Sequence, residues 1–186
     1  MLGCMREFGV VFPDKVAAYQ DAYNMWGSLL WPMADVNQDI GDPPSVSGWE
    51  AYYQAPQFHE IWINSDTLPK RNQFTDAMIS FGFTQDETTV IIDALAFTSR
   101  LPNPSDPNAL VNDAVALLYR MPISDTTKQM IKQQILLSNQ TADYYWTNAW
   151  NAYLAEPTNQ MVVNVVNTRL KGFYQYLMNM AEYQLS

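Results

Sequence analysis

The sequence contains few of the side chains that disulfides and most metal sites need. Cys4 is the only cysteine, which excludes an internal disulfide and a thiolate-rich zinc or iron–sulfur site within the chain. His59 is the only histidine, and the pair His59-Glu60 lacks the second histidine that a zinc protease helix carries four residues on. We therefore expect no metal ion and no cofactor. Cys4 is interpreted as a packing residue, because the lone imidazole is distant in sequence.

Loops that bind calcium or phosphate are also missing. Asp35, Asn37, Asp39 and Gly41 resemble a fragment of an EF-hand loop, but the twelfth position is Val46 rather than Glu. The sequence contains neither a glycine-rich phosphate loop nor a nucleophile elbow. No short sequence motif therefore identifies a chemical activity for this chain.

Basic residues and long apolar runs are scarce as well. Ten Lys and Arg against nineteen Asp and Glu give a net charge of -9, which argues against nucleic acid because phosphate binding needs clustered positive charge. No apolar run approaches the ~18 residues of a membrane-spanning helix. With 48% apolar residues, the chain is predicted to fold as one soluble domain over residues 1–186. The opening Met-Leu-Gly-Cys-Met is unlike a signal peptide, so we expect further sequence upstream.

Apolar residues spaced by three and four predict a mainly helical fold. Helices are expected over residues 19–33, 66–81, 107–119, 124–137 and 159–182, with another that carries residues 146–154 and stops at Pro157. Residues 88–98 fit either a strand or a helix, because β-branched residues at 90–92 precede a helix-forming segment. The predicted fold class is an irregular bundle of about six helices with few or no strands.

Two of the expected helices carry long apolar stripes, and the stripe of the last helix is interpreted as core. The stripe of the first helix comprises Tyr19, Ala22, Tyr23, Trp26, Leu29, Leu30 and Met33. The stripe of the last helix comprises Val162, Val165, Val166, Leu170, Phe173, Leu177 and Met180. Between residues 35 and 58, several Gly and Pro residues exclude a regular helix and predict one long loop.

A motif rich in Pro and Trp occupies this loop and the helix start after it. It runs Asp42-Pro-Pro-Ser-Val-Ser-Gly-Trp49, then Trp62-Ile-Asn-Ser-Asp-Thr-Leu68, followed by Arg71, Asn72 and Phe74. The motif resembles a bacterial family known as domain of unknown function 1800, and the resemblance covers nearly the whole chain. The departures are Ser45 in place of the usual Asn, Pro69 in place of an aliphatic residue, and a longer insertion at residues 50–61.

The resemblance implies a context for the chain. Members of the family are longer and have a large helical N-terminal portion, so the chain is expected to be the C-terminal part of such a protein. Similar proteins look exported, which implies a periplasmic or cell-surface location. They often accompany a second exported family, so the resemblance implies another exported protein as a partner.

One interpretation makes the motif a buttressed loop. Ser65 or Asp66 caps the helix that follows, and Asn64 and Ser65 bind amide groups of the loop and the helix end. Arg71 then binds a carboxylate, such as that of Asp42 or Asp66, or a cluster of loop carbonyls. In this interpretation the chain is a structural or interaction module that packs on the N-terminal portion, and it should expose an apolar surface on residues 1–12 or on a helix face.

Two alternatives place a functional site at the same motif. A carbohydrate- or peptide-binding site would use the faces of Trp49 and Trp62, with polar contacts from the remaining candidates. Those candidates are Asp42, Asn64, Ser65 and Arg71. A hydrolase would need two carboxylates roughly 5–10 Å apart across a cleft. The carboxylates near the motif are Asp35, Asp39, Asp42, Glu50, Glu60 and Asp66.

Overall fold

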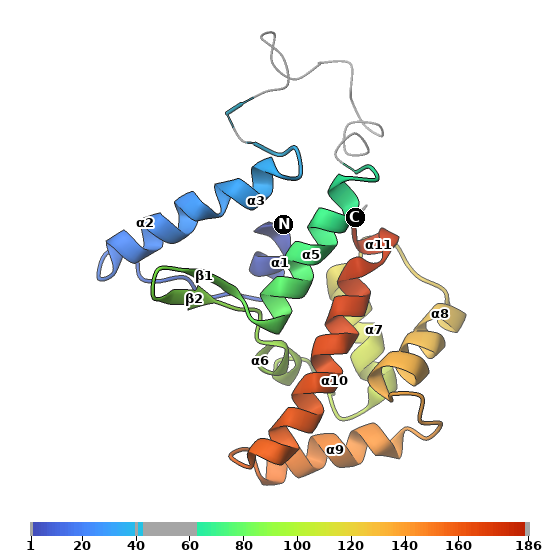
Figure 1. Cartoon of the computed structure of the whole chain (residues 1–186). Helices are drawn as coiled ribbons and strands as arrows, with labels where there is room; N and C mark the ends of the chain where they lie inside the picture. Colours follow the sequence, from blue (N-terminus) through green and yellow to red (C-terminus); the bar gives the residue numbers. More distant parts are fainter. Residues whose placement is uncertain (1, 40, 43–62, 185–186) are drawn as a thin grey trace. The chain divides into compact units, whose positions relative to one another are not determined.

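The computed structural model of the chain describes residues 2–39, 41–42 and 63–184 (Figure 1). Over these residues the fold is mainly α-helical, as predicted, and its strands form a two-stranded sheet. The chain groups into two compact units. Unit 1 contains the described residues up to Arg6 and those between Val10 and Ile92, and unit 2 contains Glu7–Gly9 and Asp93–Gln184. The single-domain organisation stays a prediction.

Unit 1 holds the first helices and the sheet. Its elements are α1 (Leu2–Glu7, whose last residue belongs to unit 2), α2 (Tyr19–Ser28), α3 (Leu30–Ala34), α5 (Thr67–Ser80), β1 (Phe83–Gln85) and β2 (Thr88–Val90). Its core is built from buried aliphatic, thioether and aromatic side chains. They include Cys4, Met5, Ala22, Met25, Leu29, Met33, Val36, Phe74, Met78, Ile79, Val90 and Ile92.

The helix expected over residues 19–33 divides into α2 and α3 at Leu29. Pro32 has no N–H group to donate to the carbonyl of Ser28, and its ring crowds that carbonyl. The break therefore falls one turn before the proline, whereas the sequence placed the end of a single helix after it.

A hairpin settles the ambiguous segment at residues 88–98, which is strand β2 followed by helix α6 (Ala94–Ser99). Strands β1 and β2 pair in antiparallel register, with Phe83 opposite Val90. Gly82 precedes the hairpin with a φ of +81°, and a Cβ atom there would lie 2.5 Å from the carbonyl oxygen of Val90. Only glycine fits this position without strain.

Side-chain hydrogen bonds join the hairpin to α2. The Asn24 amide donates to a carboxylate oxygen of Asp86 at 3.1 Å, and the Ser28 hydroxyl donates to the Gln85 side-chain carbonyl at 2.6 Å. These bonds hold one side of α2 against the sheet, so the opposite side of α2 faces away from it.

Unit 2 is an assembly of helices around the long helix α10 (Gln160–Asn179). Its other elements are α6, α7 (Pro107–Leu118), α8 (Asp125–Met130), the π-helix η1 (Ile131–Leu136), α9 (Tyr144–Ala155) and α11 (Ala181–Gln184). Helix α10 packs against α6, α9 and η1. The largest fully buried side chains of this unit include Trp146, Trp150, Phe173, Tyr174, Leu110, Ile131, Leu136 and Leu137.

Polar side chains at helix starts explain where several helices of unit 2 begin. Asp93, Asp106, Ser124 and Asn159 each accept a hydrogen bond from a backbone N–H group of the first turn, at 2.8 to 3.2 Å. Such a cap satisfies a donor that has no partner within the helix. The prediction that Ser124 or Asp125 caps its helix is confirmed for Ser124.

The helix expected over residues 124–137 changes its winding halfway. Its second half is the π-helix η1, where the N–H of Leu137 donates to the carbonyl of Lys132, five residues back, at 2.9 Å. A π-turn contains one more residue than an α-turn and thereby shifts the side chains that follow it. Helical periodicity in the sequence does not detect this extra residue.

Candidate functional site

The described part of the Pro/Trp motif begins with a helix cap built around Asn64. The Asn64 side-chain carbonyl accepts hydrogen bonds from the N–H groups of Asp66 and Thr67, each at 2.9 Å. In return, the Thr67 hydroxyl accepts one from the N–H of Asn64 at 3.0 Å. The backbone carbonyl of Asn64 also accepts from Leu68 at 3.0 Å, as the first bond of the helix. Asn64 is therefore the capping residue of α5.

This cap corrects one prediction and agrees with another. The sequence favoured Ser65 or Asp66 as the cap, but neither side chain caps α5, because Asn64 already accepts from the two N–H groups that need a partner. Asn64 does bind helix-end amides, as the buttressed-loop interpretation expects. The carboxylate of Asp66 forms an ion pair with Lys70, four residues on, at 2.8 Å.

The remaining candidate residues of the motif lie in different surroundings. Ser65 is exposed in the turn that leads into α5, Arg71 is half-buried on α5, and Asp42 is exposed. Trp49 and Trp62, which the ligand-site interpretation requires, lie outside the described residues. Asn64, Ser65 and Arg71 therefore lie near the start of α5 only because they are close together in the sequence.

The carboxylates proposed for hydrolysis are placed only in part. Asp35 and Asp42 are exposed, Asp39 is half-buried and Asp66 pairs with Lys70, whereas Glu50 and Glu60 lie outside the described residues. Over the described ranges, no three His, Cys, Asp or Glu residues are grouped so that they could hold a metal ion. Cys4 is buried in unit 1, and this burial raises the pKa of its thiol to about 11, as expected for a packing cysteine.

A hollow of about 320 Å³ in unit 1 is lined almost entirely by apolar side chains. One wall comes from α1 and the segment after it, with Met5, Arg6, Val10 and Phe12. The other wall comes from α2 and α3, with Trp26, Leu29, Leu30 and Met33. We call this hollow the N-terminal groove. It combines the residue 1–12 segment with a helix face, the two places where an interaction module was expected to expose apolar surface.

Helices α2 and α3, which form one wall of the N-terminal groove, also expose large aromatic side chains, which we call the aromatic rim; of these, Trp26 lines the groove. The exposed fractions are 56% for Tyr19, 64% for Tyr23, 41% for Trp26 and 78% for Trp31. The rings of Tyr23 and Trp26 meet edge to face, with centroids 5.6 Å apart. Within the apolar stripe of this segment, Ala22, Leu29 and Met33 are buried, whereas the aromatic members are exposed.

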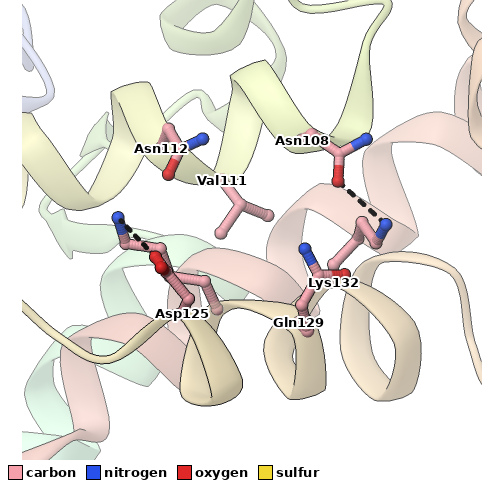
Figure 2. Close-up of a pocket in the computed structure, with 7 residues that line it drawn as sticks. Asn108, Val111, Asn112, Asp125, Gln129 and Lys132 are labelled. Carbon is pink, nitrogen blue, oxygen red and sulfur yellow. Dashed lines mark hydrogen bonds and ion pairs between the residues drawn. The ribbon is translucent and has the colours of Figure 1, made fainter.

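A second, polar pocket of about 80 Å³ lies in unit 2 between α7 and the α8–η1 segment (Figure 2). Helix α7 contributes Asn108, Val111 and Asn112. The α8–η1 segment contributes Asp125, Lys128, Gln129 and Lys132. This pocket was not predicted from the sequence, because it forms only where two helices meet and neither helix carries a recognisable binding motif.

Lys132 is fixed at one end of the polar pocket by a hydrogen-bonded network. Its ammonium group donates to the Asn108 side-chain carbonyl at 2.8 Å and pairs with a carboxylate oxygen of Asp143 at 2.9 Å. The Asn108 amide donates to the other oxygen of Asp143 at 2.8 Å. Partial burial favours a higher pKa for Asp143, but the hydrogen bonds from Lys132 and Asn108 outweigh it and hold that pKa below its usual value.

Comparison with known proteins gives one match. A family model described as protein of unknown function (DUF1800) matches residues 2–185. No curated protein and no solved structure matches the chain. In the part of the chain that the structure describes, no helix is both long and apolar enough to cross a membrane.

Proposed function

The chain belongs to the family of proteins of unknown function DUF1800, and from this premise we propose that it is a non-catalytic interaction module of an exported bacterial protein. In this proposal the N-terminal groove and its aromatic rim bind the helical N-terminal portion of the longer parent protein. The motif at residues 42–74 serves as a buttressed loop that leads into α5.

The observation that carries the proposal is the apolar character of the N-terminal groove and its rim. If each aromatic side chain offers ~200 Å², the exposed fractions of the four rim residues amount to roughly 500 Å². A monomer rarely exposes a contiguous apolar patch larger than a few hundred Å² unless the patch binds something. The rim lies on α2 and α3, which follow each other along the chain (Figure 1).

The chemistry of the groove suits an amphipathic helix. Its lining is apolar, and one charged side chain, Arg6, is among the lining residues. A partner helix binds such a groove with apolar residues spaced by three and four, and Trp and Tyr are the side chains most often dominant in such contacts. The family resemblance supplies a helical partner within the same parent protein.

The motif at residues 42–74 has a structural part in this proposal. The reciprocal hydrogen bonds of Asn64 and Thr67 fix where α5 begins. Helix α5 then buries Phe74, Met78 and Ile79 in the core of unit 1. A fixed start of α5 anchors the end of the long loop, which is what a buttressed loop requires.

The test is a binding measurement between the 186-residue chain and the upstream helical portion of the parent protein, produced separately. We expect saturable binding by calorimetry. A Tyr23→Ser, Trp31→Ser double variant should bind at least about tenfold more weakly, because truncation of central aromatic contacts typically costs ~2 kcal/mol or more. Both side chains are exposed, so the melting temperature should change little.

A matched control removes apolar surface elsewhere. Tyr144 and Met161 in unit 2 are 55% and 77% exposed, and the double variant Tyr144→Ser, Met161→Ser should bind the upstream portion as the unmodified chain does. Equal affinities for the two double variants, or no binding by the unmodified chain, would contradict the proposal. Export is checked separately by fractionation of the bacterial cells, where a cytoplasmic parent protein would contradict it.

A carbohydrate- or peptide-binding module is the second candidate. The exposed rings of Tyr23, Trp26 and Trp31 favour it, because aromatic faces stack on sugars and on apolar peptide side chains. A glycan array distinguishes it from the first candidate, which requires no sugar binding. Saturable binding of a soluble glycan, lost in Trp31→Ser, supports this role; no binding to any glycan or peptide counts against it.

A further inference from the structure

We propose that the polar pocket between α7 and the α8–η1 segment is a binding site for the carboxylate group of a small organic acid or of a peptide chain end. The pocket lies in unit 2 and is separate from the N-terminal groove, so this inference does not rest on the proposed function. It rests on the size of the pocket, on two lysines and on two amide side chains that line it.

The size of the pocket limits what can enter. A water molecule occupies about 30 Å³ of liquid volume and a cavity of about 150 Å³ holds benzene, so a pocket of about 80 Å³ accommodates a carboxylate with one or two carbon atoms. Because it opens to solvent, a longer ligand can extend outward beyond the pocket. The side chain of Val111 lies between the polar residues and offers an apolar contact to those carbon atoms (Figure 2).

Lys132 is held in place before any ligand arrives. Its ammonium group contacts the Asn108 side-chain carbonyl at 2.8 Å and the two carboxylate oxygens of Asp143 at 2.9 and 3.3 Å, and its side chain is only 13% exposed. Lys132 therefore offers the pocket an ordered positive charge rather than a free N–H donor. A positive group that is already ordered loses little conformational entropy on binding a ligand.

Lys128 supplies a second positive charge that is weakly engaged. Its nearest ion-pair partner is Asp125, at 3.9 Å, and the Asp125 side chain is fully exposed. An ion pair of this length and exposure contributes little. The ammonium group of Lys128 can therefore turn to a ligand at small cost.

The amide side chains of Asn112 and Gln129 complete the site from opposite walls, Asn112 on α7 and Gln129 on α8 (Figure 2). Neither side chain forms a hydrogen bond with any residue that the structure describes. Each NH2 group offers two donors, which match the two acceptor oxygens of a carboxylate. Together with the two lysines, these amides provide polar groups from both helices for one small anionic group.

The charge balance favours a carboxylate over phosphate. The lining contains Lys128, Lys132 and Asp125, and Lys132 is paired with Asp143, so the net charge of the site is close to zero. The whole chain carries a formal charge of -9, which repels multiply charged anions. The π-helix that carries Lys132 adds a further indication, because short π-segments occur frequently at functional sites.

The experiment is a titration of the isotopically labelled 186-residue chain followed by ¹H–¹⁵N NMR. Acetate is the probe, acetamide is its neutral isostere, and chloride at equal ionic strength is the salt control. We expect acetate to shift the side-chain NH2 signals of Asn112 and Gln129 saturably, with a Kd of roughly 1–10 mM for so small a ligand. Acetamide and chloride should not produce a saturable shift of these signals.

Variants then test which residues bind the anion. Lys128→Met and Gln129→Leu should each weaken acetate binding at least about fivefold, whereas Lys15→Met, the same charge change in unit 1, should have no effect. A spectrum that otherwise matches the unmodified chain shows that each variant is folded. Equal shifts with acetate and acetamide, or equal affinities in Lys128→Met and Lys15→Met, would overturn the proposal.

Two further probes identify the source of the carboxylate. N-acetyl-glycylglycine carries a peptide chain end, and its amidated form lacks the charge. Tighter binding of the free peptide than of acetate assigns the site to a protein or peptide chain end. Equal or weaker binding of the peptide assigns it to a small organic acid, and binding of the amidated peptide as strong as that of the free peptide contradicts a carboxylate site.

Discussion

Replacement of Asn64 by alanine removes the cap of α5 and is the sharpest test of the buttressed-loop interpretation. The side-chain carbonyl of Asn64 accepts two backbone hydrogen bonds at 2.9 Å. Loss of a capping side chain typically costs ~1 kcal/mol, with a range of about 0.5–2 kcal/mol. Because two N–H groups lose their partner here, Asn64→Ala should lower the free energy of unfolding by roughly 1–2 kcal/mol, or the melting temperature by about 3–6 °C.

Two neighbouring substitutions serve as controls for this cap. Asn64→Asp keeps the accepting oxygen and adds a negative charge near a helix N-terminus, so it should restore most of the lost stability at neutral pH. Ser65→Ala changes the exposed neighbour that caps nothing and should stay within about 0.5 kcal/mol of the unmodified chain. Denaturant unfolding measures all three. A loss below ~0.3 kcal/mol in Asn64→Ala, or an equal loss in Asn64→Asp, would refute the reasoning.

Three further predictions concern packing and charge. Gly82→Ala should destabilise the chain by roughly 2–4 kcal/mol, because Gly82 has a positive φ and an added Cβ atom would clash with its surroundings. Gly27→Ala is the control: a Cβ atom there meets nothing within 4 Å, so the substitution should stabilise the helix by up to ~1 kcal/mol. Thermal unfolding measures both variants. Lys132→Met should lower the free energy of unfolding by roughly 0.5–1 kcal/mol above about pH 5, where the Asp143 carboxylate is charged. Because the folded-state pKa of Asp143 is depressed, this difference in unfolding free energy between the variant and the unmodified chain should shrink as the pH falls below about 4. Cys4 should resist a thiol reagent in the native chain and react fully in denaturant, since burial raises its pKa to about 11; rapid native labelling would contradict its packing role.

The helical class of the fold was predictable because it depends on local signals. Capping residues, helix-breaking prolines and three-and-four apolar spacing act within one turn of the chain, and they placed α5, α7 and α10 within a few residues of their observed bounds. The cap at Asn64 was assigned one or two residues too late. Ser, Asp and Asn are nearly equivalent as caps, so sequence alone could not decide between adjacent positions.

Burial was less predictable than helix formation. Tyr19, Tyr23 and Trp26 follow the same spacing as Ala22 and Leu29 but are exposed, because one side of α2 packs against the hairpin and the opposite rim does not. One signal was present: apolar residues at Met25 and Trp31 add to the stripe, so the segment is apolar over more than one face. A helix that is apolar over more than one face needs more than one partner, and the described core supplies only part of that contact.

The polar pocket could not be predicted, for a different reason. Asn108 and Lys132 are 24 residues apart and belong to helices whose crossing depends on tertiary packing. Asparagine, glutamine and lysine on helix surfaces are common in any sequence, so these residues gave no signal on their own.

The most direct test of the proposed interaction module is whether the N-terminal groove is covered in the longer parent protein that the proposal requires. Oxidative footprinting with mass spectrometry measures the solvent access of Tyr23 and Trp31 in the parent and in the 186-residue chain, with the exposed Met161 of unit 2 as the internal reference. The account predicts that labelling of Tyr23 and Trp31 falls at least about fivefold in the parent while labelling of Met161 stays the same. Labelling of Tyr23 and Trp31 at the same rate in both proteins would contradict it.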